Sequence, residues 1–351
     1  MNPVHCIAKQ FAPALINITP LGNGLINDTY LVVTDTQRLV LQKINRQVFP
    51  RPELIMANLS RLSEHVGQAS RELTQLVIPE LLKTTAGANY YLDDHNDYWR
   101  ALSYIDQTES LETIRTLADA EQAGAALGCF HCLVSDLNPD NLHDTLPGFH
   151  IAPDYLTQYQ QILAQPTCKP DADCATFINE FHHLVNDLEN AKQQGLLRQR
   201  IIHGDPKLNN FLFDKRSRQV VSLIDLDTVK PGLVHYDIAD CLRSCCHNPD
   251  TDRFQLDVCE AILKSYLREV GSFFSEHDYR YLYPAIRLIP FELGLRFYTD
   301  YLAGNRYFKV SEPQQNLQRA AQQFRLCADI IAGESAINSL IARLRTQLDH
   351  A

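Results

Sequence analysis

The sequence predicts an α+β protein of two lobes, a small β-rich N-terminal lobe over residues 1–105 and a larger, mostly helical C-terminal lobe over residues 106–351. The first observation is length, because 351 residues exceed one small core and suit two lobes that share a cleft. The second is a change of pattern: short β-branched and aromatic runs dominate the first hundred residues, and long amphipathic runs dominate the rest. Hydrophobic residues at 45% and charged residues at 21% are typical of a globular chain.

The first lobe alternates short apolar runs with turn residues and contains one longer helical pattern. In chain order, we expect strands over 17–21, 29–34 and 38–44, a helix over 53–66, and strands over 77–79, 89–92 and 98–103. Residues 35–37 are typical of a hairpin turn, and Pro52 presets the backbone for a helix start.

The second lobe follows a joint that we place near residues 104–109, where a strand gives way to polar residues. Apolar residues at helical spacing predict its helices, and β-branched runs predict strands at only two places. We expect helices over 117–133, 175–194, 255–270 and 278–302, and strands over 201–202 and 220–224.

Composition excludes several classes of function. A formal net charge of −10 disfavours nucleic-acid and anionic-membrane partners. The chain has no run of about 18 apolar residues that could span a bilayer, and its first residues lack the apolar core of a signal peptide, so we expect a cytoplasmic protein. The ten cysteines include Cys129 and Cys132 in a CxxC pair, but no second pair lies at zinc-ligand spacing. We expect reduced thiols in helices.

The strongest chemical signal is the run IIHGDPKLNNFL over residues 201–212, followed by VSLIDLDT over residues 221–228. An apolar strand ends at Asp205, Asn210 follows five residues later, and a second strand ends at Asp225. If these strands pair through a hairpin at 215–219, the three side chains converge. Phosphoryl transfer needs this set, a base for the attacking hydroxyl and two oxygen ligands for magnesium.

Protein kinases use the same plan, with an Asp, an Asn five residues later and a second Asp after a hairpin. The form here, H-G-D-x-x-x-x-N, resembles that of the aminoglycoside phosphotransferase, choline kinase and homoserine kinase group. The resemblance implies a two-lobed, protein-kinase-like fold. Alternatives stay open for single residues: Asp205 and Asp225 as turn caps, His203 as a loop support with no acid–base work, and Asp227 as a second metal ligand or a loop brace.

In the first lobe, Gly22 and Gly24 precede a strand at the place where a phosphate-covering hairpin is expected. Strand alternation puts Lys43 on one face with Leu39 and Leu41, which suits an ammonium that reaches nucleotide phosphates. A register slip of one residue would put Gln42 there instead.

A helix glutamate is expected to orient Lys43, and the sequence does not choose between Glu53 and Glu64. Asn27, which follows the glycine turn, completes the expected nucleotide-binding set.

A closer resemblance runs over roughly residues 10–310, to the N-acetylhexosamine 1-kinases. It rests on the following segments: GNGLINDTY over 22–30, LQKIN over 41–45, DPKLNN over 205–210, IDLDTV over 224–229, YDIAD over 236–240 and GLRFYTDYLAGNRYFK over 294–309. The chain departs from the family pattern at 151–153, where IAP stands in place of an acidic residue and a Thr, and at His203-Gly204.

The resemblance implies a specific reaction, with Asp205 as the base toward the C1 hydroxyl of GlcNAc or GalNAc and ATP and Mg²⁺ as cofactors. Arg296 and Tyr307 are expected to contact the sugar, and Asp300 is the nearby acidic residue that would suit a cationic acceptor. Asn210 and Asp225 are the expected metal ligands. The alternatives are a kinase for another small acceptor, such as an aminoglycoside, an amino alcohol or a different sugar, and a non-catalytic nucleotide-binding regulator.

Overall fold

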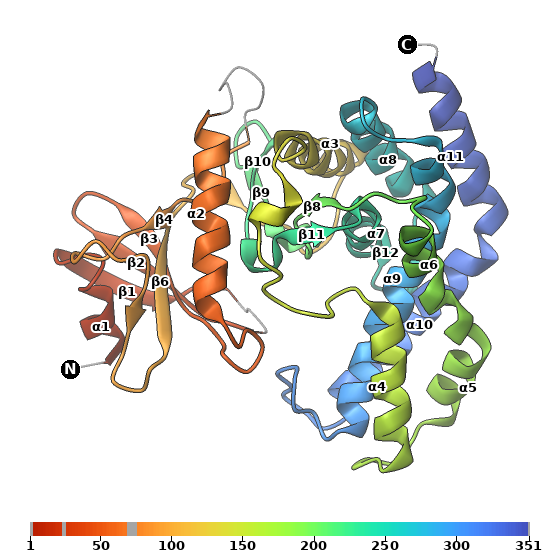
Figure 1. The fold of residues 1–351 in the computed structure, drawn as a ribbon, viewed down its shortest axis with the longest axis horizontal. Coiled ribbons are helices and arrows are strands. Elements are labelled where there is room, and N and C mark those ends of the chain that lie inside the picture. Colours follow the sequence, from red (N-terminus) through yellow and green to blue (C-terminus); the bar gives the residue numbers. More distant parts are fainter. Residues whose placement is uncertain (1–2, 23–25, 69–75, 350–351) are drawn as a thin grey trace.

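A computed structural model describes residues 3–22, 26–68 and 76–349, and it confirms the two-lobed α+β architecture (Figure 1). An antiparallel sheet forms the N-terminal lobe, in the order β1-β2-β3-β6-β4. The short β5 also pairs with β6, next to the residues that pair with β4. The strands of this sheet are β1 (Leu15–Pro20), β2 (Asp28–Thr34), β3 (Arg38–Lys43), β4 (Leu81–Leu82), β5 (Tyr91–Leu92) and β6 (Tyr98–Ser103). The hairpin turn predicted at 35–37 is confirmed, since the Thr34 amide donates to the Gln37 carbonyl across it at 2.9 Å.

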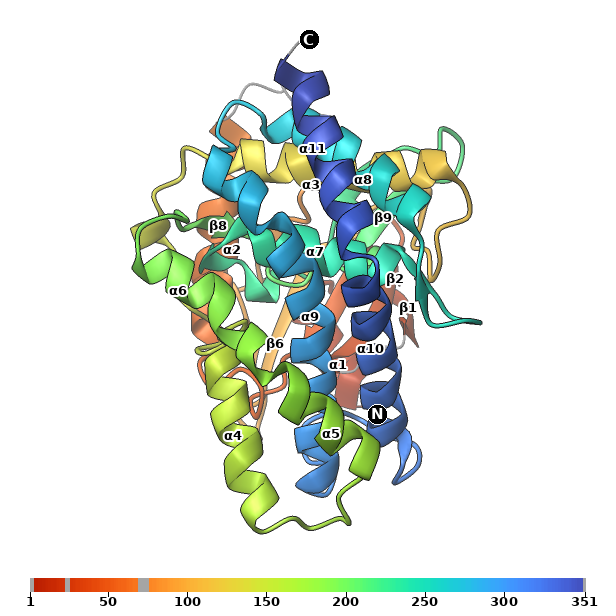
Figure 2. The ribbon, with the colours of Figure 1, turned by 90° about the vertical axis from the view of Figure 1, so that its right-hand side faces the viewer.

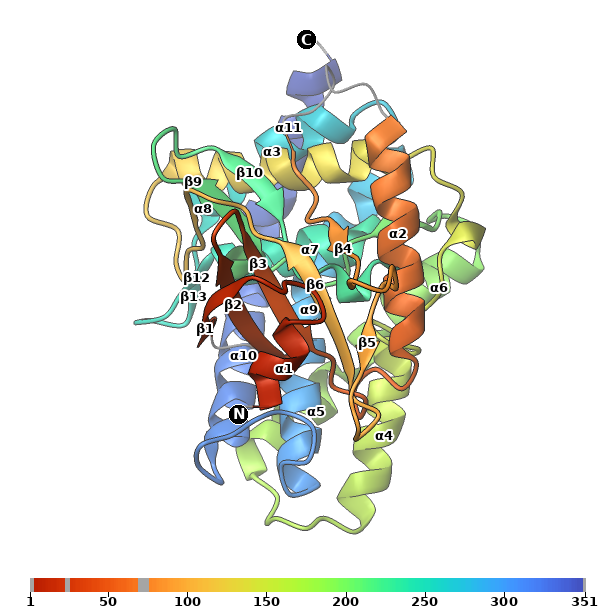
Figure 3. The ribbon, with the colours of Figure 1, turned by 90° about the vertical axis from the view of Figure 1, so that its left-hand side faces the viewer.

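The two faces of this sheet have different neighbours. Leu39 and Leu41 of β3 pack with Trp99 of β6 in a small core on the outer face, which α1 (Pro3–Ala8) covers (Figure 3). The opposite face turns toward α2 (Pro52–Gln68), which stands between the sheet and the C-terminal lobe in Figure 1. The predicted helix therefore forms, and it packs beside this face of the sheet.

The segment between α2 and β4 differs from the prediction. Residues 77–79 form no strand of the N-terminal sheet; instead, Val77 makes an isolated parallel bridge with Ser222, and its amide donates to the Val221 carbonyl at 2.7 Å. Ile78 and Leu76 are buried in the large core of the C-terminal lobe. Val77 itself is exposed, and the backbone of this segment pairs with an edge strand of the other lobe.

Helices dominate the C-terminal lobe, as predicted. The first, α3 (Leu117–Leu133), has the predicted bounds and packs along α8 (Leu256–Val270). The long α9 (Glu276–Leu302) runs through the centre of the lobe, as Figure 2 shows. Packed around α9 are α4 (Ala152–Ala164), α7 (Val234–Cys245), α10 (Gln315–Ala332) and α11 (Glu334–Asp349).

One predicted helix is broken. The pattern over 175–194 becomes α5 (Ala172–Phe181), a 3₁₀ segment (His182–Asn186) and α6 (Asp187–Gln193). Leu184 and Val185 are buried in the 3₁₀ segment, so the tighter turn lets two consecutive apolar residues enter the core.

The strand pairing in this lobe also corrects the prediction. The strand before Asp205, β8 (Arg200–Ile202), pairs with β11 (Lys230–Gly232), while β9 (Phe211–Asp214) and β10 (Val220–Leu223) form the hairpin through 215–219. The short β7 (Thr108–Glu109) joins β9, and β12 (His247–Asn248) pairs with β13 (Arg253–Phe254). Five strands among the described residues of this lobe, β7, β9, β11, β12 and β13, were therefore missed, each of them only two to four residues long.

All ten cysteines are free thiols. Burial and the neighbouring Glu269 raise the pKa of Cys129 to about 12 and raise that of Cys132, so neither is a reactive thiolate. Among the described residues, no three His, Cys, Asp or Glu side chains group as a metal cluster. In the same part of the chain, no helix combines the length and the apolar character that a membrane span requires.

Candidate active site

Asp205, Asn210 and Asp225 meet at one end of the short strands in the C-terminal lobe. The Asn210 amide nitrogen Nδ2 donates to the Asp205 backbone carbonyl at 2.7 Å and to its carboxylate oxygen Oδ2 at 3.3 Å. The Ile224 amide donates to the Asn210 carbonyl at 2.9 Å, which places Asp225 beside this loop. The convergence expected from the sequence therefore occurs, although β9 and not β8 pairs with β10.

Lys207 lies between the two carboxylates. Its ammonium is 2.5 Å from Asp205 Oδ2 and 4.0 Å from Asp225 Oδ2. The Lys207 side chain is 34% exposed. Desolvation lowers the pKa of Lys207, but the carboxylates of Asp205 and Asp225 outweigh it and leave the pKa raised. The site therefore holds a fixed positive charge between its predicted base and its predicted metal ligand.

The carboxylate of Asp225 is electrostatically crowded. Asp225 has a left-handed backbone with φ of 66°, and its side chain remains 40% exposed. Desolvation and the carboxylates of Asp227 and Asp205 raise the pKa of Asp225 to about 6, against the opposing charges of Lys207 and Arg100. Crowding of this kind favours a bound cation, since a cation would restore the ionised form.

These residues fit a magnesium site. Asp225 offers an accessible carboxylate. Asn210 donates its Nδ2 to Asp205, and its amide oxygen accepts no hydrogen bond from the described residues. Two protein oxygens and the oxygens of a bound nucleotide are the donors that Mg²⁺ prefers. Asp225 and Asn210 are thus the residues that would hold the ion.

Asp237 of α7 anchors the catalytic loop from behind. Its buried carboxylate accepts from the His203 amide at 2.6 Å and from the Gly204 amide at 2.8 Å. His131 of α3 donates to the same carboxylate across 2.9 Å, and its other ring nitrogen bonds the hydroxyl of Tyr266 in α8. Burial opposes ionisation of Asp237, yet the His131 bond and these amides keep its pKa lowered.

His203 and Gly204 shape the loop just before the base. His203 Nε2 lies 3.0 Å from the Ile224 carbonyl, and its Nδ1 accepts from the Asp205 amide at 3.3 Å. Burial lowers the pKa of His203, so a neutral ring with a proton on Nε2 fits both bonds. Gly204 has φ of +87°, and a Cβ there would lie 2.6 Å from the Thr228 carbonyl oxygen. The arrangement favours loop support for His203 over acid–base work.

His150 joins this loop to the long helix α9. It has a left-handed backbone with φ of 66°, and its Nε2 lies 2.8 Å from the Gly204 carbonyl. Its Nδ1 lies 3.0 Å from Oε1 of Glu292. Both partners are acceptors, so both ring nitrogens must donate and His150 is cationic.

Arg296 lies on the same face of α9, one turn beyond Glu292. Its guanidinium carbon is 4.9 Å from the ring centroid of Phe149 and 5.1 Å from that of Tyr155. The rings of Tyr307 and Phe308 lie 5.9 Å and 5.6 Å away. Arg296 makes no ion pair with any described carboxylate, so it is a cation held by aromatic faces.

The electrostatics connect Arg296 to the base. Desolvation lowers the pKa of Arg296, but Tyr155, Tyr307, Glu292 and Asp205 raise it by more. The charge of Asp205 is thus among those that raise the pKa of Arg296.

Asp300 has a different role from the expected one. Its Oδ1 accepts from the amides of Arg306 and Tyr307, both at 2.8 Å, and its Oδ2 accepts from the Phe308 amide at 3.0 Å. The side-chain amide of Asn316 donates to Oδ2 as well, at 2.9 Å. Asp300 is 6% exposed. It holds the loop that carries Tyr307 and Phe308, so it is not a free carboxylate for a cationic acceptor.

The residues of the first lobe that were expected to bind the nucleotide only partly have the expected arrangement. Gly22 has φ of +70°, which suits a tight turn, and Gly24 lies outside the described residues. Lys43 shares a face with Leu39 and Leu41, as predicted, but its ammonium pairs with Asp97 at 2.5 Å. The Asp97 hydrogen bond raises the pKa of Lys43, in spite of desolvation.

The expected glutamate partner of Lys43 is therefore wrong. Asp97 takes that place, and Glu53 pairs with Arg51 at 3.1 Å.

Gln42 occupies the face that turns toward the C-terminal lobe. Its Oε1 accepts from Nε and Nη2 of Arg100, its neighbour on β6, at 3.0 Å and 2.7 Å. Arg100 also pairs with the carboxylate of Asp227, and Asn27 donates to that carboxylate at 2.8 Å. Asn27 and Asp227 therefore join the two lobes. The other end of the Asn27 side chain, Oδ1, accepts from the Asn45 amide, so both ends of this side chain are engaged.

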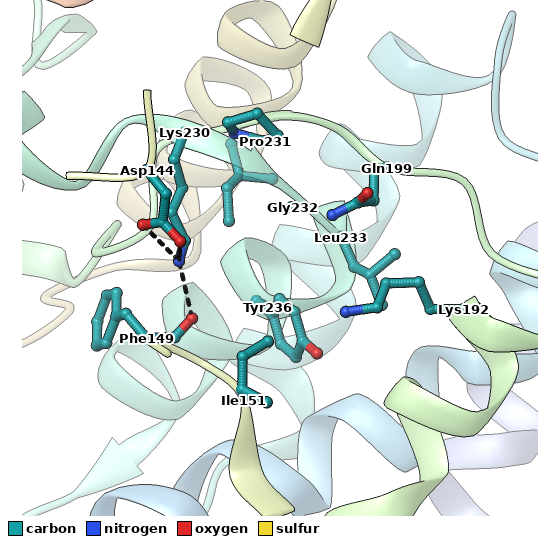
Figure 4. A pocket seen from close by; sticks show the side chains of 11 residues that line it. Asp144, Phe149, Ile151, Lys192, Gln199, Lys230, Pro231, Gly232, Leu233 and Tyr236 are labelled. Carbon is teal, nitrogen blue, oxygen red and sulfur yellow. Dashed lines mark hydrogen bonds and ion pairs between the residues drawn. The ribbon is translucent and has the colours of Figure 1, made fainter. Parts of the chain in front are cut away.

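A separate small cavity, of about 80 Å³, lies behind β8 and β11 (Figure 4). Lys230 projects toward it but is bound to both Asp144 oxygens at 3.1 and 3.2 Å and to the Phe149 carbonyl at 3.1 Å. The cavity is lined by none of Asp205, Asn210 and Asp225. Lys230 binds the segment that carries Phe149 at one side of the cavity, and the cavity is no part of the phosphoryl site.

Sequence reasoning missed four contributors to the site: Lys207, His150, Glu292 and Arg100. Lys207 carried a signal, because it lies two residues after the base in the same motif. His150, Glu292 and Arg100 lie more than fifty residues from their partners, so only tertiary contacts identify them.

Residues 17–273 match the family described as "Phosphotransferase enzyme family". Among solved structures, the chain resembles an aminoglycoside phosphotransferase from Alicyclobacillus acidocaldarius at 17% identity, with a TM-score of 0.65 over 99% of this chain and 96% of that one. It resembles a microcompartment-associated aminopropanol kinase at 18% identity, with a TM-score of 0.69 over 95% and 98%. An amicoumacin kinase in complex with AMP-PNP and Ca²⁺ matches at 14% identity, with a TM-score of 0.61 over 93% of each chain. These similarities confirm the protein-kinase-like fold.

Proposed function

This chain belongs to the phosphotransferase enzyme family, and we propose that it is an ATP- and Mg²⁺-dependent kinase that phosphorylates the C1 hydroxyl of an N-acetylhexosamine, GlcNAc or GalNAc. The kinase chemistry rests on one cluster, in which Asp205, Lys207, Asn210 and Asp225 meet in the C-terminal lobe. The complex of the amicoumacin kinase with AMP-PNP and Ca²⁺ supports a nucleotide and a divalent cation in such a fold.

Each group has a defined task in the proposed reaction. Asp205 orients the acceptor hydroxyl and takes its proton as the oxygen bonds to the γ-phosphorus and the bond to the ADP oxygen breaks. Lys207, between Asp205 and Asp225, offers positive charge to the transferring phosphoryl group. Asp225 and Asn210 would hold the magnesium ion, which when bound neutralises charge on the β- and γ-phosphates.

The acceptor class rests on Arg296. Its guanidinium lies among four aromatic rings and makes no ion pair with a described carboxylate. The aromatic faces suit the apolar face of a sugar, and the guanidinium suits its hydroxyl and acetamide oxygens. Glu292 adds a buried acceptor, since its Oε2 has no hydrogen-bond partner among the described residues.

The same electrostatics disfavour the aminated acceptors named for the similar structures. An ammonium group would meet Arg296, while two nearby carboxylates are engaged: Asp300 by three backbone amides and Glu292 by His150. A cationic acceptor would have to share the carboxylate of Asp205 with Lys207, whose ammonium lies 2.5 Å from it. A neutral sugar avoids this repulsion.

The proposal is tested by ADP release from the purified full chain with ATP and Mg²⁺. The acceptor panel holds GlcNAc, GalNAc, N-acetylmannosamine, glucose, kanamycin, choline and homoserine, and phosphorus NMR identifies the product. We expect a sugar 1-phosphate from GlcNAc or GalNAc. Turnover with a cationic acceptor alone would overturn the sugar assignment and leave a kinase, whereas nucleotide binding without acceptor-dependent ADP release would indicate a regulator.

Two variants separate the roles of base and acceptor contact. Asp205→Asn should retain ATP affinity and lose turnover by about three orders of magnitude or more, since base and orientation are removed together. Arg296→Met preserves much of the side-chain bulk, and it should raise KM for the sugar by roughly tenfold or more while KM for ATP stays unchanged. Retained turnover in Asp205→Asn would remove Asp205 from the mechanism.

A further inference from the structure

Arg100 is a cation of the N-terminal lobe that pairs with Asp227, two residues beyond Asp225. It lies on β6, opposite Gln42 of β3 in the antiparallel register, on the sheet face turned toward the C-terminal lobe. Only 1% of its side chain is exposed. A guanidinium this deeply buried is costly unless its N–H donors have hydrogen-bond acceptors, so a donor without an acceptor indicates a place for a ligand.

The hydrogen bonds of Arg100 are incomplete. Nε and Nη2 share the neutral amide oxygen of Gln42, and Nη2 also pairs with the carboxylate of Asp227. Nη1 is buried and has no hydrogen-bond partner among the described residues. Arginine has five N–H donors, so one edge of the guanidinium has no acceptor among the described residues and can bind one from a ligand.

The position that strand alternation favoured for a phosphate-binding cation is engaged elsewhere. Lys43 lies on the opposite sheet face, where Asp97 holds its ammonium at 2.5 Å, and the charges that act on it come from Asp97, Asp93 and Asp28. Gln42, the residue that does face the junction, carries no charge.

We propose that Arg100 binds the phosphate groups of the nucleoside triphosphate, taking on β6 the role expected of Lys43 on β3. The proposal rests on the proposed kinase function and assigns the phosphate-binding cation of that same site. A phosphate oxygen is a stronger acceptor than the Gln42 amide because charge-assisted hydrogen bonds are shorter and stronger, so a bound nucleotide competes with Gln42 for the guanidinium. Asp227 keeps Arg100 beside Asp225 during that exchange.

The test is isothermal titration calorimetry of the full chain with AMP, ADP and ATP, each with Mg²⁺, for the wild type and for Arg100→Gln and Arg100→Lys. A phosphate contact predicts a loss that grows with the number of phosphates: ATP affinity falls by roughly 10- to 100-fold in Arg100→Gln, and AMP affinity changes by about twofold or less. Arg100→Lys, which keeps a charge without the fork, should recover part of the ATP affinity.

Two further variants supply the comparison. Lys43→Gln removes the competing cation and should retain the wild-type ratio of ATP to AMP affinity, as should Arg38→Gln, which removes an exposed arginine from the same sheet. A loss in Lys43→Gln that grows with phosphate number would return the role to Lys43 and overturn the proposal. Equal loss of AMP and ATP affinity in Arg100→Gln would overturn it too, because that result indicates a structural link between the lobes.

The outcomes also separate this proposal from the proposed function. A wild-type chain that binds ATP while the Arg100 variants keep the wild-type affinity ratio overturns only the role of Arg100. A wild-type chain that binds no nucleotide overturns both. If Arg100→Gln does not fold, Arg100→Lys carries the test, since a lysine with full ATP affinity and an unchanged ATP-to-AMP ratio would contradict the requirement for a guanidinium.

Discussion

At the scale of single residues, the site contains buried charged side chains that each have only a few hydrogen-bond partners. His150 is the clearest case, since its ring nitrogens face the Gly204 carbonyl and the Glu292 carboxylate, which are both acceptors. Burial lowers the pKa of His150, but Glu292, the Gly204 carbonyl and Asp240 raise it by more. A raised native pKa means that the stabilising contribution is full below the ordinary value of about 6.5 and is lost as pH rises through the native value.

This sign predicts how His150→Gln behaves. The substitution should lower the free energy of unfolding by about 1–3 kcal/mol near pH 6, where the charged pair is intact, and by less near pH 9. Urea denaturation at the two pH values measures the difference.

His235 supplies a matched control of opposite sign. Burial and the charge of His131 lower its pKa, against Asp278, so the native state holds it neutral. His235→Gln should therefore cost more at pH 9 than at pH 6. If both variants showed the same pH dependence, the cationic state of His150 would be refuted.

At the scale of elements, the catalytic loop depends on two helices, α3 and α8, that carry none of the predicted site residues. His131 of α3 and Tyr266 of α8 bond each other, and His131 bonds Asp237, which holds the loop before Asp205. The helices approach closely at Gly124, where an added Cβ would lie 2.2 Å from the Ile262 carbonyl oxygen. A change in the distance between α3 and α8 would therefore shift the loop before Asp205, through the hydrogen bonds that link Tyr266, His131 and Asp237.

Gly124→Ala tests this packing. Alanine favours a helix over glycine by about 1 kcal/mol, but overpacking against a backbone carbonyl costs roughly 1–3 kcal/mol or more and should win. We expect a net loss of about 1–2 kcal/mol in the free energy of unfolding, together with reduced kcat. Gly67→Ala in α2 is the control: nothing lies within 4 Å of its Cβ, so thermal denaturation should show unchanged or slightly higher stability. A Gly124→Ala variant as stable as the wild type would contradict the close approach.

At the scale of the whole molecule, buried and exposed ion pairs both connect the lobes. Asp227 of the C-terminal lobe pairs with Arg100 of the sheet, and the two side chains are 2% and 1% exposed. Lys309, just beyond α9, pairs with Asp28 at 3.2 Å, and these side chains are 52% and 54% exposed. Breaking the two ion pairs should cost different free energies of unfolding. Water screens the exposed pair, whereas a buried charge that loses its partner is left uncompensated.

Asp227→Ala should therefore lower the free energy of unfolding by about 3–5 kcal/mol, since it leaves the Arg100 charge uncompensated and removes the acceptor of Asn27. Lys309→Ala should cost about 1 kcal/mol or less. Chemical denaturation of both variants measures the contrast, and separate melting of the two lobes in Asp227→Ala would agree with it. Equal costs would show that Asp227 is not the main interlobe connection.

The sequence alone determined what local pattern and spacing control. Helix α3 and the hairpin of β2 and β3 appeared where apolar periodicity and turn residues predicted them, because those signals act within a few residues. The cluster of Asp205, Asn210 and Asp225 also followed from one motif. The two-lobed fold was predictable for the same reason, as each lobe has its own pattern.

Only the tertiary structure decided the pairings that join distant residues. It gave β8 the partner β11, engaged Asp300 with its own loop, paired Lys43 with Asp97 and buried Arg100 beside Asp227. None of these has a sequence signal, because a carboxylate or an ammonium accepts many partners and the free energy of burial selects one. Strand alternation could place Lys43 on a face, but which lobe that face meets is set by how the sheet packs.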